Sequence, residues 1–482
     1  MKLYSANLNH TLFQGNMLDM LEVIKPETID SIVTDPPYEL NFMGKGWDNS
    51  GIAFQVDTWQ KCYEVLKPGG YLLAFGGSRT FHRIACAIED AGFEIRDTIM
   101  WLYGSGFPKS MNIGKAVEGK LTIGSANVKD IKKLDGEKTK VTCGFNATGK
   151  ITGYRSKEYE MIKTDVKYHT ELGKRWQGWG TALKPSFEPI IVARKPFKGS
   201  LVDNVLEYGV GGINIDECRV EPTGEDIGRN NHKNPYGNER TWNTSKTPPQ
   251  NTTGRYEGRF PANTILTYDE TDLDEVCGGF PDTKSKASTY NFEKTSQDNP
   301  SHLYTNIKSG VHYGDNGSAS RYFYCAKASK KDRDEGLEKF EEKNMRIEQN
   351  RKIHSAGCEY IENGKLKQNP HLQSSIKKNI HPTVKPTELM QYLVRLVTPQ
   401  GGVVLDPFNG SGSTGKAVMY ENNERNKNYK YIGIELTEEY LPIAKARIEY
   451  AFNKKQTVQK ETDQLSLFDI EEGVENNDDS KG

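Results

Sequence analysis

The sequence has little cysteine, no charge imbalance and no long apolar run, and each absence narrows the choice of protein class. Lys and Arg together number 64 against 65 for Asp and Glu, so the net charge argues neither for nor against a nucleic-acid partner. The 7 cysteines are scattered and include no Cys-x-x-Cys pair, which argues against a disulfide framework and a structural zinc site. We therefore expect no bound metal and a reducing, intracellular setting.

Long apolar segments are also missing. No run is long enough to cross a bilayer, and the amino terminus lacks the apolar core of a signal peptide. We expect a cytoplasmic protein without a membrane partner. The 482 residues are enough for a sizeable core and for more than one domain.

The first hundred residues do contain a regular alternation of strand-like apolar runs and helix-like spacing. Pro68 and two glycines follow the first long helical pattern, which is a strong helix-end signal. The alternation predicts an α/β fold, in which a mostly parallel sheet carries helices on both faces. The expected strands are 11–14, 29–33, 71–75 and 95–102, and the expected helices are 54–66 and 81–91.

From about residue 103 to 381 the regularity fails, and the sequence is rich in Gly, Asn, Ser, Thr and Lys. A structureless loop of this length is improbable inside one domain, so we interpret most of it as an inserted subdomain with long loops. Its apolar islands are 187–193, which we expect to be a strand, 204–215, 262–267 and 321–326. Order returns with an expected helix at 386–397, strands at 403–405 and 431–436, and a helix at 438–452.

In the segment VLDPFNGSGSTG, residues 404–415, the expected strand 403–405 ends and a glycine-rich turn begins at Asp406. In a doubly wound sheet such a turn lies at the edge where ligands bind, and Gly410 and Gly412 allow close backbone approach. The turn lacks the Gly-Lys-Ser/Thr ending of a phosphate loop and does not match Gly-x-Gly-x-x-Gly. Glu435 ends the next strand, where a carboxylate commonly binds a ribose diol. The pattern predicts an adenosine-type cofactor without a pyrophosphate; the alternative is an ordinary turn and a surface glutamate.

A rigid corner, Asp35-Pro36-Pro37-Tyr38, follows the expected strand 29–33. The two prolines fix the backbone and remove two N–H donors. An exocyclic ring amine is a poor nucleophile, and acceptors for its hydrogens help to localise its lone pair. The carboxylate of Asp35 and the carbonyl of Pro36 are two such acceptors, and the ring of Tyr38 can stack on a base. The alternative is a turn stiffened by proline.

Together these two motifs resemble the DNA amino-methyltransferases, which methylate adenine N6 or cytosine N4 with S-adenosylmethionine. The catalytic motif precedes the cofactor motif, an order similar to that of the family's permuted beta group. The family often has Gly-Asp where this chain has Gly15-Asn16. Further segments that resemble the family, many members of which are phage or mobile-element enzymes, are His381 to Pro386 (HPTVKP), Trp101 to Lys109, Trp179 to Lys195 and Ser318 to Ser329.

The resemblance implies a Rossmann-like, circularly permuted sheet that binds S-adenosylmethionine and carries a large irregular recognition insert. It implies methylation of adenine N6 in double-stranded DNA after base flipping, in a bacterial or phage-infected cell, by an enzyme that can be a homodimer. The catalytic residues that it implies are Asp35, Pro36, Pro37 and Tyr38. The cofactor-binding residues that it implies are Asn16, Thr383, Lys385, Asp406, Pro407, Phe408, Gly410, Ser411, Gly412 and Glu435.

The same resemblance divides the chain into four parts. Residues 1–197 form the catalytic half of the core, with a loop-rich insert at about 106–179. Residues 198–379 form the target-recognition insert, and 380–453 form the cofactor-binding half of the core. Residues 454–482 are polar and acidic, which predicts a disordered tail.

Three other functions stay open. Cytosine N4 methylation is the nearest, although an acid before Pro-Pro-Tyr is more usual for adenine in this family and serine for cytosine. A methyltransferase for protein glutamine side chains also uses a Pro-Pro-Tyr corner, but those enzymes have Asn before the prolines and an unpermuted order. The third alternative is a catalytically inactive DNA-binding module.

The expected tail contains one apolar cluster, QLSLF, in otherwise polar sequence. It resembles the peptide by which bacterial DNA-processing proteins bind the replication sliding clamp, with Gln464 in polar contacts and Leu465, Leu467 and Phe468 in apolar contacts. The alternative is that the cluster folds back on the catalytic domain. Equal clamp binding by peptide 461–470 and its Leu467→Ala, Phe468→Ala variant would favour the fold-back.

Overall fold

The computed structural model describes the two ends of the core and scattered parts of the middle of the chain. The tail beyond residue 454, and with it the QLSLF cluster, lies outside the described residues. None of the helices that the structure describes is long and apolar enough to cross a membrane. The described residues are 2–40, 50–103, 110–126, 136–143, 159–220, 259–268, 282–284, 288–290, 310–312, 316–318, 323–327, 330–341, 343–344, 359–362, 365–368 and 376–454.

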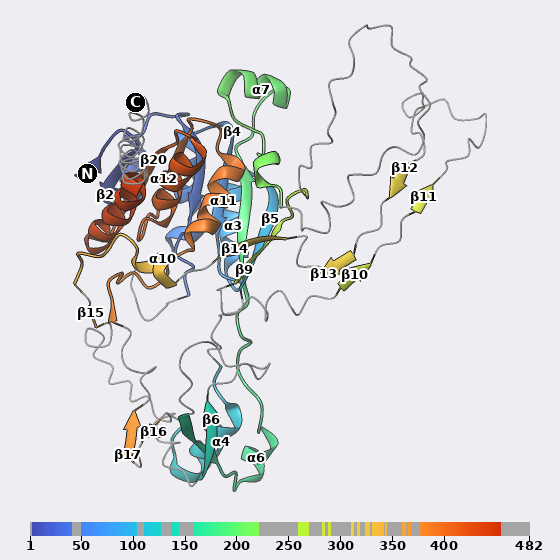
Figure 1. Cartoon of the computed structure of the whole chain (residues 1–482), viewed down its shortest axis with the longest axis vertical. Helices are drawn as coiled ribbons and strands as arrows, with labels where there is room; N and C mark the ends of the chain where they lie inside the picture. The colour runs from blue at the N-terminus through green and yellow to red at the C-terminus, as the bar shows by residue number, and fades with distance from the viewer. Residues whose placement is uncertain are drawn as a thin grey trace, which may run out of the picture.

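A ten-stranded mixed sheet forms the centre of the molecule (Figure 1). All its strands run in the same direction except β1 and β8, which are antiparallel to their neighbours. The strands, in spatial order, are β1 (Lys2–Ala6), β2 (His10–Gln14), β20 (Lys430–Glu435), β19 (Val403–Asp406), β3 (Ile29–Thr34), β4 (Leu66–Phe75), β8 (Phe187–Arg194), β5 (Glu94–Tyr103), β9 (Thr264–Tyr268) and β14 (Tyr324–Lys327).

Helices cover both faces of this sheet, because neighbouring strand residues point to opposite sides. Ile32 packs with the helices of the amino-terminal half, while the next residue, Val33, packs with those of the carboxyl-terminal half. The first face is covered by α1 (Met17–Leu21), α2 (Val56–Val65) and α3 (Phe81–Asp90). The second face is covered by α11 (Thr387–Val397), α12 (Ser413–Arg425) and helical residues 441–454.

The expected α/β sheet with helices on both faces is therefore confirmed, and most expected elements lie within a few residues of their place. One boundary differs: β4 begins at Leu66 and not at residue 71. Backbone bonds from Gly69 N to Lys195 O and from Lys195 N to Gly70 O extend the pairing with β8 through the glycines. The island 204–215 overlaps helix α7 (Leu201–Tyr208), which has a capping box at Ser200 and Asp203.

Two strands from the expected recognition insert join the main sheet. β9 pairs with β5, and β14 pairs with β9, both in parallel. The four-part division of the chain stays a prediction.

The remaining described elements are α4 (Ile113–Ile123), α6 (Glu171–Arg175), α10 (Lys330–Asp334), η3 (Ile52–Phe54), η4 (Asp216–Cys218), η8 (Glu438–Tyr440), β6 (Gly136–Cys143), β7 (Tyr159–Val166), β10 (Asp282–Lys284), β11 (Ser288–Tyr290), β12 (Gly310–His312), β13 (Asn316–Ser318), β15 (Lys343–Asn344), β16 (Glu359–Glu362), β17 (Lys365–Gln368) and β18 (Ile376–Lys377).

Candidate functional site

Three acidic residues lie where neighbouring parallel strands end. Asp35 directly follows β3, Asp406 ends β19 and Glu435 ends β20. Because β19 pairs in parallel with both β3 and β20, these residues reach the same edge of the sheet. The structure therefore brings the two predicted motifs together at the carboxyl edge, where α/β sheets bind ligands.

Asp406 links three segments at this edge of the sheet through hydrogen bonds to its carboxylate. Its Oδ1 accepts from Thr34 Oγ1 at 2.6 Å and from Phe408 N at 3.1 Å, and its Oδ2 accepts from Thr414 Oγ1 at 2.7 Å. Burial raises the pKa of Asp406 to about 6, although these hydrogen bonds partly offset the effect. Since internal donors occupy both oxygens, Asp406 fixes the loop between β19 and α12.

Glu435 receives the glycine-rich loop. One carboxylate oxygen accepts from Gly410 N and the other from Thr437 N, both at 2.7 Å. Burial raises the pKa of Glu435 despite these two bonds. Each oxygen has a second lone pair, so the carboxylate keeps the capacity to accept from a ribose diol.

The other loop residues are held by packing and by one arginine. Arg447 Nη1 donates to Ser411 O at 2.7 Å and to Ser411 Oγ at 3.0 Å. Gly412 has φ +74°, and a Cβ there would lie 3.0 Å from Ala444 Cα. A side chain at Gly412 would thus meet both a strained backbone conformation and a tight contact with the neighbouring helix. Pro407 precedes Phe408, whose ring lies 6.5 Å from that of Trp59.

Asn16 and Thr383, two further predicted cofactor residues, lie at the margin of this site. Asn16 is the N-cap of α1, where its side chain accepts from Leu18 N at 3.1 Å. The preceding residue, Gly15, donates its N–H to Glu435 O at 3.0 Å, which places Asn16 beside the end of β20. Thr383 is exposed, and its carbonyl contacts the ring of His381.

Lys385, which sequence reasoning assigned to the cofactor, pairs with the catalytic motif. Its Nζ donates to Asp35 Oδ2 at 2.7 Å and lies 3.4 Å from Glu188 Oε2. Burial disfavours its charge, but Asp35 and Glu188 outweigh this and raise the pKa of Lys385 above its ordinary value. The other oxygen of Asp35, Oδ1, is buried and has no donor within the part of the chain that the structure describes.

Tyr38 is held through both its side chain and its backbone. Its hydroxyl donates to Glu188 Oε2 at 2.6 Å, and its carbonyl accepts from Thr80 Oγ1 at 2.8 Å. Burial, then the charges of Asp35 and Glu188, raise the pKa of Tyr38 well above its ordinary value, so the hydroxyl stays a donor. We call Asp35, Tyr38, Glu188 and Lys385 the Asp35 cluster. Buried Pro36 and half-buried Pro37 connect its first two members.

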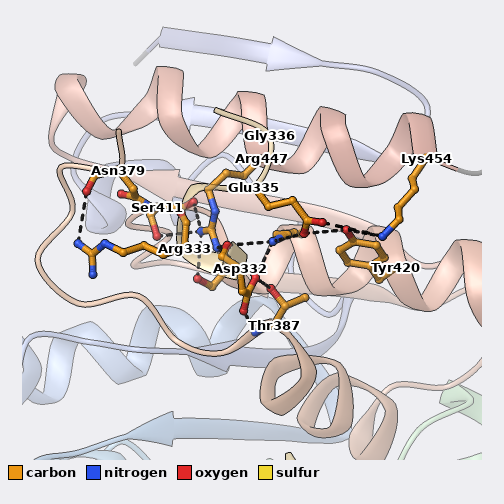
Figure 2. A network of polar contacts seen from close by, with 12 residues as sticks. Asp332, Arg333, Glu335, Gly336, Asn379, Thr387, Ser411, Tyr420, Arg447 and Lys454 are labelled. Carbon is orange, nitrogen blue, oxygen red and sulfur yellow. Dashed lines mark hydrogen bonds and ion pairs between the residues drawn. The ribbon is translucent and has the colours of Figure 1, made fainter. Parts of the chain in front are cut away.

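A buried ionic network ties residues 330–341 to the cofactor side of the core (Figure 2). Asp332 Oδ1 lies 2.6 Å from the ammonium of fully buried Lys416, and its Oδ2 accepts from Thr387 N at 2.7 Å. Arg447, also fully buried, lies within 4.0 Å of Asp332 Oδ1. Glu335 accepts from Tyr420 OH at 2.9 Å and lies 2.9 Å from Lys416 Nζ. The network fixes α11, α12 and the Ser411 loop together.

Sequence reasoning missed Glu188, Asp332 and Arg447. Glu188 lies inside a segment that resembled the family, Trp179 to Lys195, but nothing in the pattern distinguished it from a surface acid. Asp332 follows another such segment, Ser318 to Ser329, and looked like part of a charged run. The contact partners of all three residues lie far away in the sequence, so none of these contacts has a local signal.

Comparison with known proteins agrees with this geometry. Residues 29–446 match the family model described as DNA methylase, N6_N4_Mtase. The type II methyltransferase M2.LlaDCHI of Lactococcus lactis subsp. cremoris is 30% identical over 234 residues, covering 44% of this chain and 82% of that protein. The type II methyltransferase M.HindIII of Haemophilus influenzae is 26% identical over 163 residues, which are 33% of this chain; the match spans only 38% of that protein's length.

Two solved structures are also similar. The cytosine-N4-specific PvuII DNA methyltransferase has a TM-score of 0.36 at 13% identity, covering 94% of this chain and 96% of that one. The M1.HpyAVI–SAM complex has a TM-score of 0.34 at 14% identity, covering 91% and 99%. Scores of this size do not establish a shared fold. The family model and the lactococcal relative do establish the family: the chain belongs to the N6/N4 DNA methylase family.

Proposed function

We propose that the protein is a site-specific DNA methyltransferase that transfers a methyl group from S-adenosylmethionine to adenine N6 of a base flipped out of duplex DNA. The observation that supports this most is the buried Oδ1 of Asp35, an acceptor without a donor among the described residues. A buried, unpaired carboxylate oxygen is costly unless a ligand pairs with it. An exocyclic amine brings the N–H donor that this oxygen requires.

The residues of the glycine-rich loop fit the proposed cofactor. Glu435 is nearly buried and retains lone pairs for a ribose diol, and Gly410 places a backbone N–H beside it. When bound, S-adenosylmethionine supplies a methyl group activated by attachment to a sulfonium. The contribution of this chain is to hold the amine at Asp35 and to exclude water. The amine nitrogen would gain the methyl carbon as the carbon–sulfur bond breaks, with its electron pair staying on sulfur in a neutral thioether. The nitrogen also loses one proton, and the Asp35 carboxylate is available to accept it.

Access to the amine requires base flipping, because in a duplex the amine is paired and stacked. Extruding a base costs a few kcal/mol, and stacking on an aromatic ring returns about 1–3 kcal/mol. Tyr38 is the ring of the Asp35 cluster that we assign to this stacking. Its hydrogen bond to Glu188 at 2.6 Å fixes the ring before the base arrives.

Cytosine N4 is the second candidate target, because the same carboxylate oxygen accepts from a cytosine amine. The acid at position 35 favours adenine. The test is to express the protein in a host that lacks DNA methylation and to read the modified bases of its genome. We expect N6-methyladenine at one recurring sequence, and none with Asp35→Ala. N4-methylcytosine would establish the alternative, and an unmodified genome with folded protein present would overturn the proposal.

A further inference from the structure

Lys385, the lysine beside Asp35, is buried between carboxylates and aromatic rings, unlike a solvated surface charge. The side chain of Lys385 is only 8% exposed, yet its ammonium lies 2.7 Å from Asp35 and 3.4 Å from Glu188. A buried cation of this kind is stable only when it is paired. Three aromatic rings complete its surroundings, with centroids 5.2 Å (Tyr38), 4.9 Å (Phe75) and 5.9 Å (Trp101) from Nζ.

This lysine makes the two oxygens of Asp35 different from each other. Oδ2 receives the short bond from Lys385, whereas Oδ1 has no donor in the described part of the chain. A charge-assisted bond to one oxygen limits rotation of the carboxylate, so the direction of the other oxygen is fixed. The free oxygen is then available to a base amine.

Glu188 holds both the lysine and the aromatic ring. Its Oε2 accepts from Tyr38 OH at 2.6 Å and lies 3.4 Å from Lys385 Nζ, and its Oε1 accepts from Tyr103 OH at 3.3 Å. Glu188 is the second residue of β8, which is antiparallel to β4. The start of β8 therefore lies at the edge where β4 ends, and the Glu188 carboxylate contacts two other members of the Asp35 cluster, Tyr38 and Lys385.

We propose that Lys385 and Glu188 are positioning residues for the target base. Lys385 donates to Oδ2 of Asp35, which leaves Oδ1 to accept from the amine of the base. Glu188 fixes the positions of Lys385 and Tyr38 relative to each other. The inference rests on the proposed function and deepens it, since it names the residues that orient the acceptor. It also moves Lys385 from cofactor binding to the methyl-transfer step.

The first test compares Lys385→Met and Lys385→Arg in the full-length protein, on a duplex that carries the site read from the methylated genome. For Lys385→Met we expect kcat to fall by about 100-fold, the loss typical of a misplaced reacting group. The KM for DNA and the calorimetric affinity for S-adenosylmethionine should stay unchanged. Lys385→Arg should recover part of kcat, because a guanidinium still donates to Asp35.

Lys195→Met is the matched control. The side chain of Lys195 is 7% exposed, and its ammonium donates to Tyr63 O and Leu66 O at 2.9 and 2.8 Å, away from Asp35. Lys195→Met also loses a buried charge, so a general effect on stability would lower kcat in both Lys195→Met and Lys385→Met. Glu188→Gln is the second variant and keeps an acceptor for Tyr38 while losing the charge opposite Lys385. We expect its kcat to lie between those of the wild type and Lys385→Met.

Two results would overturn the inference. Loss of cofactor affinity in Lys385→Met with kcat unchanged at saturation would return Lys385 to the cofactor site. An equal fall of kcat in Lys195→Met, or unchanged kcat in Glu188→Gln, would show that the pair has no specific role. Failure of the proposed function would be seen in the wild type, whereas failure of this inference is seen only between variants. If the wild type methylates cytosine instead of adenine, the comparison between the variants is still valid, because the target on cytosine is also an exocyclic amine.

Discussion

Arg447 donates to both the carbonyl oxygen and the hydroxyl oxygen of Ser411, at 2.7 and 3.0 Å. Arg447 is fully buried, and burial lowers its pKa to about 10 despite the charge of Asp332. It therefore stays charged at neutral pH. The conformation of the cofactor loop depends on this buried charge and on the network of Figure 2 around it.

Replacement of this arginine should destabilise the fold. Arg447→Met leaves Ser411 O without its buried donor, while Asp332 keeps its pair with Lys416, so we expect a loss of about 1–3 kcal/mol. Denaturant unfolding measures the loss. Arg194→Met is the control, since Arg194 pairs with Glu94 at 2.7 Å, but Glu94 is 42% exposed. That pair should contribute about 1 kcal/mol or less, and equal losses in both variants would contradict the assignment.

Gly412 provides a test of packing separate from cofactor binding. From the sequence alone we expect Gly412→Val to block the cofactor while preserving the fold, but the structure changes that expectation. A Cβ at Gly412 would lie 3.0 Å from Ala444 Cα and Cβ, so even Gly412→Ala should lower the free energy of unfolding. The loss should combine about 1–2 kcal/mol of backbone strain with about 1–3 kcal/mol of overpacking.

The control for this glycine has the same backbone angle. Gly401 also has φ +74°, but a Cβ there meets nothing within 4 Å. Gly401→Ala should therefore show the strain alone, and the difference between the two variants measures the packing against helical residues 441–454. If both variants lose the same stability in thermal and denaturant unfolding, the contact with Ala444 does not determine the need for glycine.

The catalytic motif separates into two roles. Asp35→Ala should lose methyl transfer while retaining cofactor and DNA binding, because the carboxylate acts on the amine. Tyr38→Phe keeps the stacking face and should retain most activity, and Tyr38→Ala should lose much more. Single-turnover methylation with separate binding titrations measures each effect. Equal losses in the Phe and Ala variants would show that the hydroxyl bond to Glu188, and not the ring, is the important feature.

Asp406 predicts a pH effect on stability. Its pKa rises from 3.8 to about 6 on folding, so its contribution is fully present below about pH 4 and is lost as the pH rises through 6. The stability of the wild type relative to Asp406→Asn should therefore fall by about 3 kcal/mol in total, of which about 2 kcal/mol is lost between pH 4 and pH 6. Urea unfolding over pH 4–7 measures this difference, and a constant difference would contradict the assignment.

Glu335 is the control of opposite sign. Burial raises its pKa, but the bond and charge of Lys416 and the bond from Tyr420 outweigh this, and the net pKa is lowered. Its contribution is present above the ordinary glutamate pKa and is lost as the pH falls. The same comparison with Glu335→Gln should thus change in the opposite direction.

Much of the sheet was predictable, because its strands are buried apolar runs bounded by turn residues. The runs at 29–33 and 403–405 became β3 and β19, and their parallel pairing places Asp35 and Asp406 at the same edge of the sheet. The motif residues at strand ends were predictable for the same reason. The local pattern of a strand and the acid that follows it is contained in a few consecutive residues.

The cluster partners were not predictable in the same way. Glu188 meets Tyr38 across 150 positions, and Lys385 meets Asp35 across 350. The reversed direction of β8 and the binding of residues 330–341 to the core depend on contacts that no periodicity records. Local sequence also did not indicate the neighbour of Lys385, since its motif lies within the expected cofactor half of the core while its side chain contacts Asp35 of the catalytic motif.

The pairing of β5 with β8 has a consequence for how freely the segment between these two strands can vary. Leu102, near the end of β5, lies opposite Phe187, the first residue of β8. The described elements between them, including α4, β6 and α6 drawn below the sheet in Figure 1, thus belong to a segment that both starts and ends at the tip of one pair of strands. The length and sequence of this segment can therefore change without altering the register of β5 with β8, and its described tie to a later part of the chain is the pairing of β7 with β16.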